Sequence, residues 1–114
     1  MRLHRTLLAV VMATAAGCVS GFSNRPSDER YLAEKEHLNS VWESLETAIN
    51  RAGEEPDEGV KHSTLSRISA LNDQLAYSGM LLVMSHAVPN AKDFDLAVAR
   101  ISAVEQEITT YNSR

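Results

Sequence analysis

The sequence predicts an all-α protein, an up-down-up bundle of three helices. Three stretches of the chain repeat apolar residues at intervals of three and four, the spacing that places them along one side of a helix. No run alternates for long between apolar and polar residues, as a half-buried β-strand would. The connections between the stretches are short, which favours antiparallel neighbours. The alternative is a helical hairpin that completes its core by self-association, because all three stretches keep heptad spacing.

The first predicted helix begins after Ser27, whose hydroxyl can accept a hydrogen bond from a free amide of the first turn. Asp28 and Glu29 follow, where the helix dipole favours acidic residues. The helix is predicted to stop at Gly53, with Arg51 in its last turn. Its apolar side comprises Tyr31, Leu38, Leu45 and Ala52, joined by Leu32, Val41, Trp42, Ala48 and Ile49. This stripe predicts that one side of the helix is buried.

A break in the apolar pattern separates the first helix from the second. Residues 54–61 contain four acidic side chains, a proline and a glycine, and predict an acidic loop. The second helix is predicted from about Ser63 to Ala87, ahead of Pro89. Gly79 weakens this helix by about 1 kcal/mol relative to alanine, which indicates either a close approach of another helix or a bend. The predicted inner face comprises Leu65, Ile68, Leu71, Leu75, Leu82 and Val83.

The third predicted helix begins after Asn90, a favourable N-cap with Asp93 three residues later. Its apolar residues alternate by three and four: Phe94, Ala97, Ile101, Val104, Ile108 and Tyr111. An up-down-up bundle then stacks its core in layers. The layer at the start of the first helix holds Tyr31, Met84 and Phe94; the next holds Leu38, Tyr77 or Gly79, and Ile101; the farthest holds Leu45, Leu71 and Ile108.

Residues 1–17 have the pattern of a secretory signal peptide. Arg2 and Arg5 give a positive start, and the apolar run Leu7–Ala16 follows. As a helix this run would reach about 15 Å, half of the roughly 30 Å hydrocarbon core of a bilayer, so it is too short to remain as a transmembrane helix. A basic start, a short apolar segment and small residues are typical of a signal that is removed after export.

The only cysteine, Cys18, follows directly. The stretch Ala15-Ala16-Gly17-Cys18 resembles the lipobox of bacterial lipoproteins, although Ala15 stands where that family usually has leucine. The resemblance implies that the thiol receives a diacylglyceryl group and that cleavage frees the Cys18 amine for a further acyl chain such as palmitate. A lone thiol cannot close a disulfide within the monomer, which favours an anchor. The alternative is ordinary cleavage after Ala13-Thr14-Ala15, which would give a secreted or soluble periplasmic protein.

The resemblance also bears on location. In enteric lipoproteins an aspartate after the cysteine resembles an inner-membrane retention signal, so Val19 points to the periplasmic face of the outer membrane if the host is Gram-negative. Residues 18–26 would form the lipidated cysteine and a short polar tether, and residues 27–114 the helical domain. Each methylene group of an acyl chain that is buried in the bilayer contributes about 0.8 kcal/mol to membrane binding, and stable attachment takes two acyl chains or one chain and a second signal. A diacylated Cys18 meets that condition.

Composition limits the partners. Loss of residues 1–17 leaves 97 of the 114 residues, enough for one small domain. Two of the 11 Lys and Arg are lost with them, so nine basic residues face 15 acidic ones and the formal charge is −6. Nucleic acid and anionic lipid both require basic patches. We therefore expect no nucleic-acid partner, and membrane attachment only through Cys18.

Side chains suited to catalysis or metal binding are few and poorly spaced. Glu34-x-x-His37 is one half of the carboxylate–histidine pattern that binds paired metals in helical bundles, but the sequence holds no second copy. Glu34 and His37 are therefore interpreted as part of a solvated helix face. Ser85 and His86 are adjacent, so on a helix they do not face each other. The sequence predicts no enzyme, no cofactor and no metal site.

The apolar stretch Gly79–Met84 covers the whole circumference of a helix, more than a three-helix bundle buries on one side. Met80, Leu81 and Met84 are therefore the candidate surface for an envelope protein or a second copy of the chain, and methionine adapts well to such surfaces. The simpler interpretation places Met80 or Leu81 at the edge of the core. We expect a small lipid-anchored envelope protein with a non-catalytic interaction or structural domain. The alternative is an exclusion or inhibitor lipoprotein, encoded by a phage or plasmid, that blocks an envelope machine.

Overall fold

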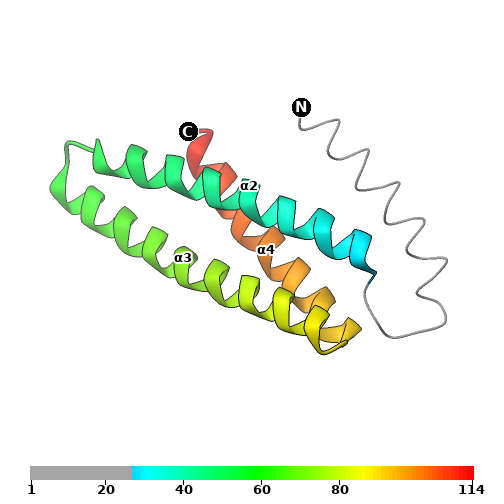
Figure 1. The fold of residues 1–114 in the computed structure, drawn as a ribbon. Coiled ribbons are helices and arrows are strands. Elements are labelled where there is room, and N and C mark those ends of the chain that lie inside the picture. The colour runs from blue at the N-terminus through cyan, green and yellow to red at the C-terminus, as the bar shows by residue number, and fades with distance from the viewer. Residues whose placement is uncertain (1–26) are drawn as a thin grey trace.

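The computed structural model describes residues 27–114, which form three α-helices: α2 (Asp28–Gly53), α3 (Glu58–Ala87) and α4 (Ala91–Asn112). Figure 1 shows α2 and α3 running antiparallel, with α4 returning along both. The predicted all-α, up-down-up three-helix bundle is confirmed. The hairpin alternative is wrong, because α4 packs against both other helices of the same chain. The predicted signal peptide (residues 1–17), Cys18 and the tether to residue 26 lie outside the described residues.

The ends of the helices follow from local capping. The Ser27 hydroxyl accepts a hydrogen bond from the Arg30 amide at 3.1 Å, and the Asn90 side-chain oxygen accepts one from the Asp93 amide at 3.1 Å. Both side chains satisfy amide groups that have no partner within the helix. The helix starts predicted after Ser27 and Asn90 are therefore confirmed.

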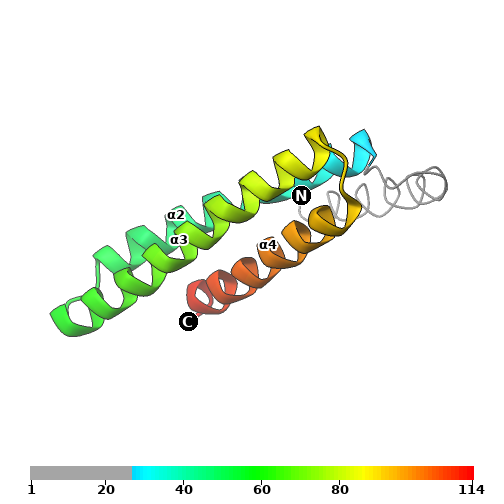
Figure 2. The same cartoon turned by 90° about the horizontal axis from the view of Figure 1, so that it is seen from below.

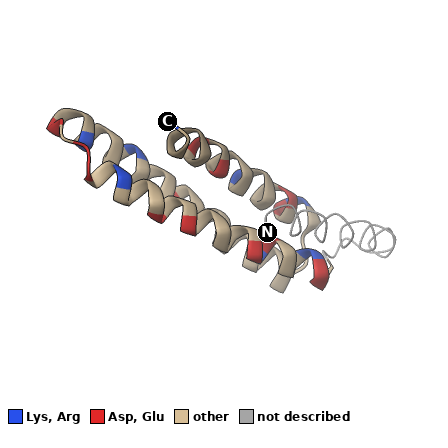
Figure 3. Ribbon diagram, turned by 90° about the horizontal axis from the view of Figure 1, so that it is seen from above, with Lys and Arg blue, Asp and Glu red and all other residues tan. Residues whose placement is uncertain are grey.

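The start of α3 differs from the prediction. The helix begins at Glu58, five residues before Ser63, and residues 58–61 belong to its first turn. Asp57 is the N-cap: its carboxylate accepts a hydrogen bond from the Val60 amide at 3.0 Å. An aspartate followed by a glutamate is a strong helix start, which outweighs the nearby glycine. The acidic connection is thus shorter than predicted, and it lies at the opposite end of the bundle from the α3–α4 turn (Figure 3).

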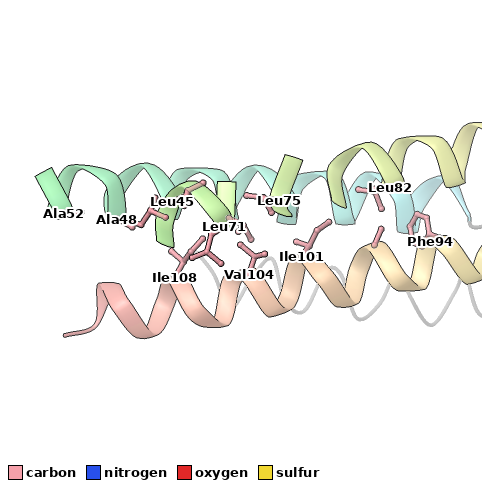
Figure 4. Close-up of a cluster of buried hydrophobic side chains, with 13 residues drawn as sticks. Leu45, Ala48, Ala52, Leu71, Leu75, Leu82, Phe94, Ile101, Val104 and Ile108 are labelled. Atoms are coloured by element: carbon pink, nitrogen blue, oxygen red, sulfur yellow. The ribbon is translucent and has the colours of Figure 1, made fainter. Parts of the chain in front are cut away.

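The three helices share one hydrophobic core (Figure 4). The buried apolar residues of α2 are Val41, Leu45, Ala48 and Ala52; those of α3 are Ile68, Leu71, Leu75 and Leu82; and those of α4 are Phe94, Ala97, Ile101, Val104 and Ile108. Tyr31, Leu38, Trp42, Leu65 and Tyr111 are partly buried against this core, whereas Leu32 and Ile49, predicted on the same stripe of α2, are exposed. The regular register predicted for α4 is confirmed.

The inner side of α3 includes two serines in place of predicted apolar residues. Ser78 and Ser85 are buried, and their hydroxyls donate to the carbonyls of Gln74 and Leu82 within the helix, at 2.7 and 3.0 Å. Each hydroxyl is therefore satisfied without a partner on another helix. The predictions for Val83 and Met84 as core residues are wrong, because both side chains are exposed. Of the two alternatives beside Leu38, Tyr77 is also exposed and Gly79 is the one that lies against Leu38. The buried positions 71, 75, 78, 82 and 85 define a stripe that leaves Tyr77, Val83 and Met84 on the other side.

Gly79 lies where α2 and α3 approach closely. A Cβ atom placed on Gly79 would lie 3.2 Å from Cδ2 of Leu38. Of the two sequence-based explanations for this glycine, a close approach of another helix is therefore the one the structure supports.

We expect Gly79→Ala to leave the stability nearly unchanged and Gly79→Leu to lower it by about 1–3 kcal/mol. Alanine gains up to about 1 kcal/mol of helix propensity, and the flexible end of Leu38 can shift by the few tenths of an ångström that the new methyl group requires. A leucine overfills the contact. Urea denaturation measures both variants, with Gly53→Ala as the control, since nothing lies within 4 Å of that position. Equal stability of the alanine and leucine variants would contradict the close contact.

Polar contacts join α2 to α4 along one side of the bundle. The Arg30 guanidinium contacts the Asp95 carboxylate at 2.7 Å, and the His37 ring contacts the Glu105 carboxylate at 2.9 Å. Farther along, the Asn112 side chain donates to the Ser44 carbonyl at 3.0 Å, and the Arg51 guanidinium donates to the Asn112 carbonyl at 2.5 Å. The α2 members of this polar column, residues 30, 37, 44 and 51, are spaced by seven.

Candidate functional site

The second half of α3 carries apolar side chains on the side that faces solvent. Met80 is 62% exposed and Met84 is 60% exposed, and Tyr77 and Val83 are also well exposed. Val88, the residue directly after the helix, is exposed as well. Between Asp73 and Lys92 the chain contains no Asp, Glu, Lys or Arg. A helix that is apolar on all sides is normally covered on all sides. We call Tyr77, Met80, Val83, Met84, Ala87 and Val88 the outer face of α3.

The three predicted surface residues differ in their surroundings. Met80 and Met84 are one helical turn apart and lie together on the outer face. Leu81 is only partly exposed and packs against the core, so the simpler interpretation holds for this residue and not for Met80. A charge at position 81 would disturb the core. Met80 is the position that tests the surface without disturbing the fold.

The outer face has a regular spacing of its own. Tyr77, Met80, Met84 and Ala87 follow one another at intervals of three, four and three, the spacing of a coiled-coil seam. The same helix thus presents one seam to the core and a second, shorter seam to solvent. Hydrophobic periodicity in the sequence indicates an excess of apolar residues here but cannot tell which seam faces inward.

The apolar surface continues onto α4. The Arg100 guanidinium lies over the Tyr77 ring, 5.5 Å from its centroid, so this part of α4 borders the outer face. Leu96, one turn earlier in α4, is also exposed. The cation–π contact places the positive charge of Arg100 at the edge of the apolar surface. The methionines at the centre of the surface have no Asp, Glu, Lys or Arg beside them along α3.

The outer face lies near the beginning of α2. The His86 ring stacks on the Tyr31 ring with centroids 3.8 Å apart, and its Nε2 lies 2.8 Å from the Asp28 carboxylate. These contacts bring the end of α3 beside the first turn of α2, where residues 1–26 join the bundle. Ser85 and His86 have separate partners, as the sequence predicted: the Ser85 hydroxyl donates to the Leu82 carbonyl.

A second cluster of polar residues links α2 to α4. The Nδ1 atom of His37 lies 2.8 Å from the Glu34 carboxylate, and its Nε2 lies 2.9 Å from the Glu105 carboxylate. The hydrogen bond to Glu34 and then the one to Glu105 raise the pKa of His37 from 6.5 to about 9, against the opposing effect of burial. The ring is therefore a cation that donates both N–H groups.

The interpretation of Glu34 and His37 as a solvated helix face is wrong, because both side chains are largely buried between the two helices. The Glu-x-x-His spacing in the sequence was the available signal, and Glu105, 68 residues away from His37, could not be paired with it from the sequence. Within residues 27–114 no group of three or more His, Cys, Asp or Glu side chains is arranged to hold a metal ion.

An open groove lies at the other end of the bundle, between α3 and α4. Its volume is about 680 Å³, and its floor includes Ile68, Leu71 and Ile108. Arg67 and Glu107 on its rim pair with each other in a bidentate contact at 2.5 Å, and this contact lowers the pKa of Glu107. The two charges therefore satisfy each other rather than select a ligand.

Comparisons of the chain with models of known protein families, with curated proteins and with solved structures found no match. In the part of the chain that the structure describes, none of the helices has the length and hydropathy needed to cross a bilayer. Cys18, the predicted lipidation site, lies outside that part.

Proposed function

We propose that this protein is a lipid-anchored cell-envelope protein whose three-helix domain is a non-catalytic interaction module. The observation that carries the proposal is the position of the only cysteine, Cys18, directly after a short apolar run and the small residues Ala15-Ala16-Gly17. A basic start before that run fits an export signal. With Val19 after the cysteine, we propose the outer membrane as the location in a Gram-negative host.

The domain supports an interaction role through the outer face of α3. Met80 and Met84 expose apolar surface, which is in contact with water when the bundle is alone and would be covered if a partner were bound. Because this face is at the end where residues 1–26 join, an anchored domain would hold it close to the membrane. Partners that are themselves membrane-attached would then meet it most readily.

We expect Cys18→Ser to abolish incorporation of a fatty-acid probe, because the serine hydroxyl cannot form the thioether that holds the diacylglyceryl group. Metabolic labelling in a bacterial host, followed by gel fluorescence, measures the incorporation. The variant should accumulate as unprocessed precursor or as soluble protein.

The control carries the thiol at a neighbouring position: Ser20→Cys in the Cys18→Ser background. In this control the thiol no longer follows Ala15-Ala16-Gly17 directly. If lipidation depends on those small residues, the control should not be labelled. Equal labelling of the wild type and the Cys18→Ser variant would show that Cys18 is not the anchor, and labelling of the control would show acylation that does not depend on the motif.

A further inference from the structure

We propose that the outer face of α3 binds the same face of a second copy, with the two α3 helices antiparallel and centred at the level of Leu82. The inference rests on the proposed function only in taking this face as the contact surface, and it does not depend on the lipid anchor. The second copy is favoured by the area of the face and by the way its residues complement themselves.

The area of the face matches what a dimer requires. Five residues of the outer face, together with Leu96 on α4, are each between 43% and 74% exposed: Tyr77, Met80, Val83, Met84, Val88 and Leu96. Residues of these sizes offer roughly 150–200 Å² each when fully exposed, so together they leave on the order of 600 Å² of apolar surface. That is at the upper end of what a monomeric protein leaves uncovered. Two such faces would bury about 1,200 Å², the lower limit of a specific and stable interface.

The seam is self-complementary when it is reversed. A two-fold axis at the level of position 82 places Met80 opposite position 84 of the second copy, so residues of equal size meet. The same axis places Tyr77 opposite position 87, an alanine. A large side chain therefore meets a small one on either side of the central methionines, as interdigitation requires.

Parallel pairing fits less well. It would place each seam residue opposite itself, so that Tyr77 meets a second tyrosine and Ala87 a second alanine. It would also place Asp73, the seam position before Tyr77, opposite another Asp73, where like charges repel. In the antiparallel pair Asp73 lies opposite position 91, past the end of the partner helix.

The antiparallel pair is also compatible with two anchors in one membrane. His86, which contacts Asp28, lies four residues after Leu82, or roughly 6 Å farther along α3. Measured along α3, the start of α2 is therefore close to the level of the proposed axis. Both copies of Ser27 would then lie near the middle of the dimer, and the distal ends of the bundles would point away from each other.

Disulfide trapping in membranes tests the pairing with the full chain. Met80→Cys and Met84→Cys chains with different tags are expressed together and oxidised. We expect the mixed dimer to exceed either self-linked dimer at least fivefold. Of the pairs that these two cysteines can form, only position 80 with position 84 of the other copy comes within the roughly 7 Å between Cα atoms that a disulfide spans. Asn50→Cys, on an exposed position of α2, measures random collision.

A charge in the seam provides an independent readout. Tyr77→Cys and Ala87→Cys also face each other in the proposed pair, so their mixed dimer reports the interface while position 80 is varied. Met80→Glu should reduce this dimer at least tenfold, because the carboxylate would be buried without a partner. Leu32→Glu is the matched control: Leu32 is 62% exposed, as Met80 is, but lies on the outward side of α2.

Three results would overturn the proposal: trapping no higher than that of Asn50→Cys, self-linked dimers exceeding the mixed dimer, or equal effects of the two glutamate substitutions. Disulfide adducts between these cysteines and a different protein would likewise show that a second copy does not cover the outer face of α3. Cysteines that lipid alone protects from oxidation would show the same. Fatty-acid labelling of the same Met80→Cys chain reports the anchor separately, so failure of the dimer and failure of the proposed function are distinguishable.

Discussion

Replacing Leu45 or Ile101 by alanine is expected to lower the free energy of unfolding by about 2–5 kcal/mol. Both side chains are at most 1% exposed and lie in the core (Figure 4). The three helices that share this core are seen from below in Figure 2. Each substitution removes three side-chain carbon atoms and leaves a cavity, because neighbours on the other helices relax only in part. A domain of this size has only about 5–15 kcal/mol of stability in total, so the loss would be large.

Thermal or urea denaturation of the wild type and the variants measures these losses. Leu32→Ala is the matched control, since this leucine is on the same helix as Leu45 but is 62% exposed. We expect it to cost less than about 1 kcal/mol. A bundle whose melting is unaffected by Leu45→Ala or Ile101→Ala, or affected equally by Leu32→Ala, would not have the core described above.

Stability is also expected to fall as the pH rises from about 6.5 through 9. The folded-state pKa of His37 is raised to about 9 from 6.5, so the folded state binds the proton more tightly than the unfolded chain does. The resulting stabilisation is fully present below pH 6.5 and is lost as the pH passes 9. Because Glu105 is 40% exposed and screened by solvent, we expect a loss of roughly 1–2 kcal/mol rather than the full value of the shift.

The control for this pH dependence is His37→Gln, which keeps a hydrogen-bond donor but not the charge. Its unfolding free energy should be lower at pH 6 and should change less between pH 6.5 and 9. Taking the difference between the two proteins removes every contribution to the pH dependence that they share. Parallel pH profiles for the wild type and His37→Gln would show that the Glu34–His37–Glu105 cluster does not stabilise the fold.

The features that could be predicted from the sequence are those set by neighbouring residues. The starts of α2 and α4 follow from Ser27 and Asn90, whose side chains cap the helix that comes next. The buried face of α4 follows from its spacing, because most residues on its other faces are polar. The fold class follows from three such helices with short connections.

Two features could not be predicted from the sequence. One is which of several similarly apolar faces of α3 turns toward the core, and the other is a contact between residues that are far apart in the chain. Around Gly79–Met84 every side of α3 is apolar, so the pattern placed Val83 and Met84 in the core where the structure has Ser85. In a sequence, a serine gives no sign of being buried, because its hydroxyl can be satisfied by a carbonyl of its own helix, as that of Ser85 is. The pairing of His37 with Glu105 joins residues on different helices, and only the relative placement of α2 and α4 brings them together.

The polar column between α2 and α4 determines how far one helix can slide along the other. A seam of apolar residues repeated every three and four positions fits nearly as well after a shift of seven residues, so hydrophobic packing alone distinguishes poorly between such arrangements. The acceptors on α4 follow a different spacing from their donors: Asp95, Glu105 and the Asn112 carbonyl are ten and seven residues apart, whereas Arg30, His37 and Arg51 are seven and fourteen apart. A shift by one heptad would separate Arg30, His37 and Arg51 from these partners. These contacts therefore select one alignment from several that the core would tolerate.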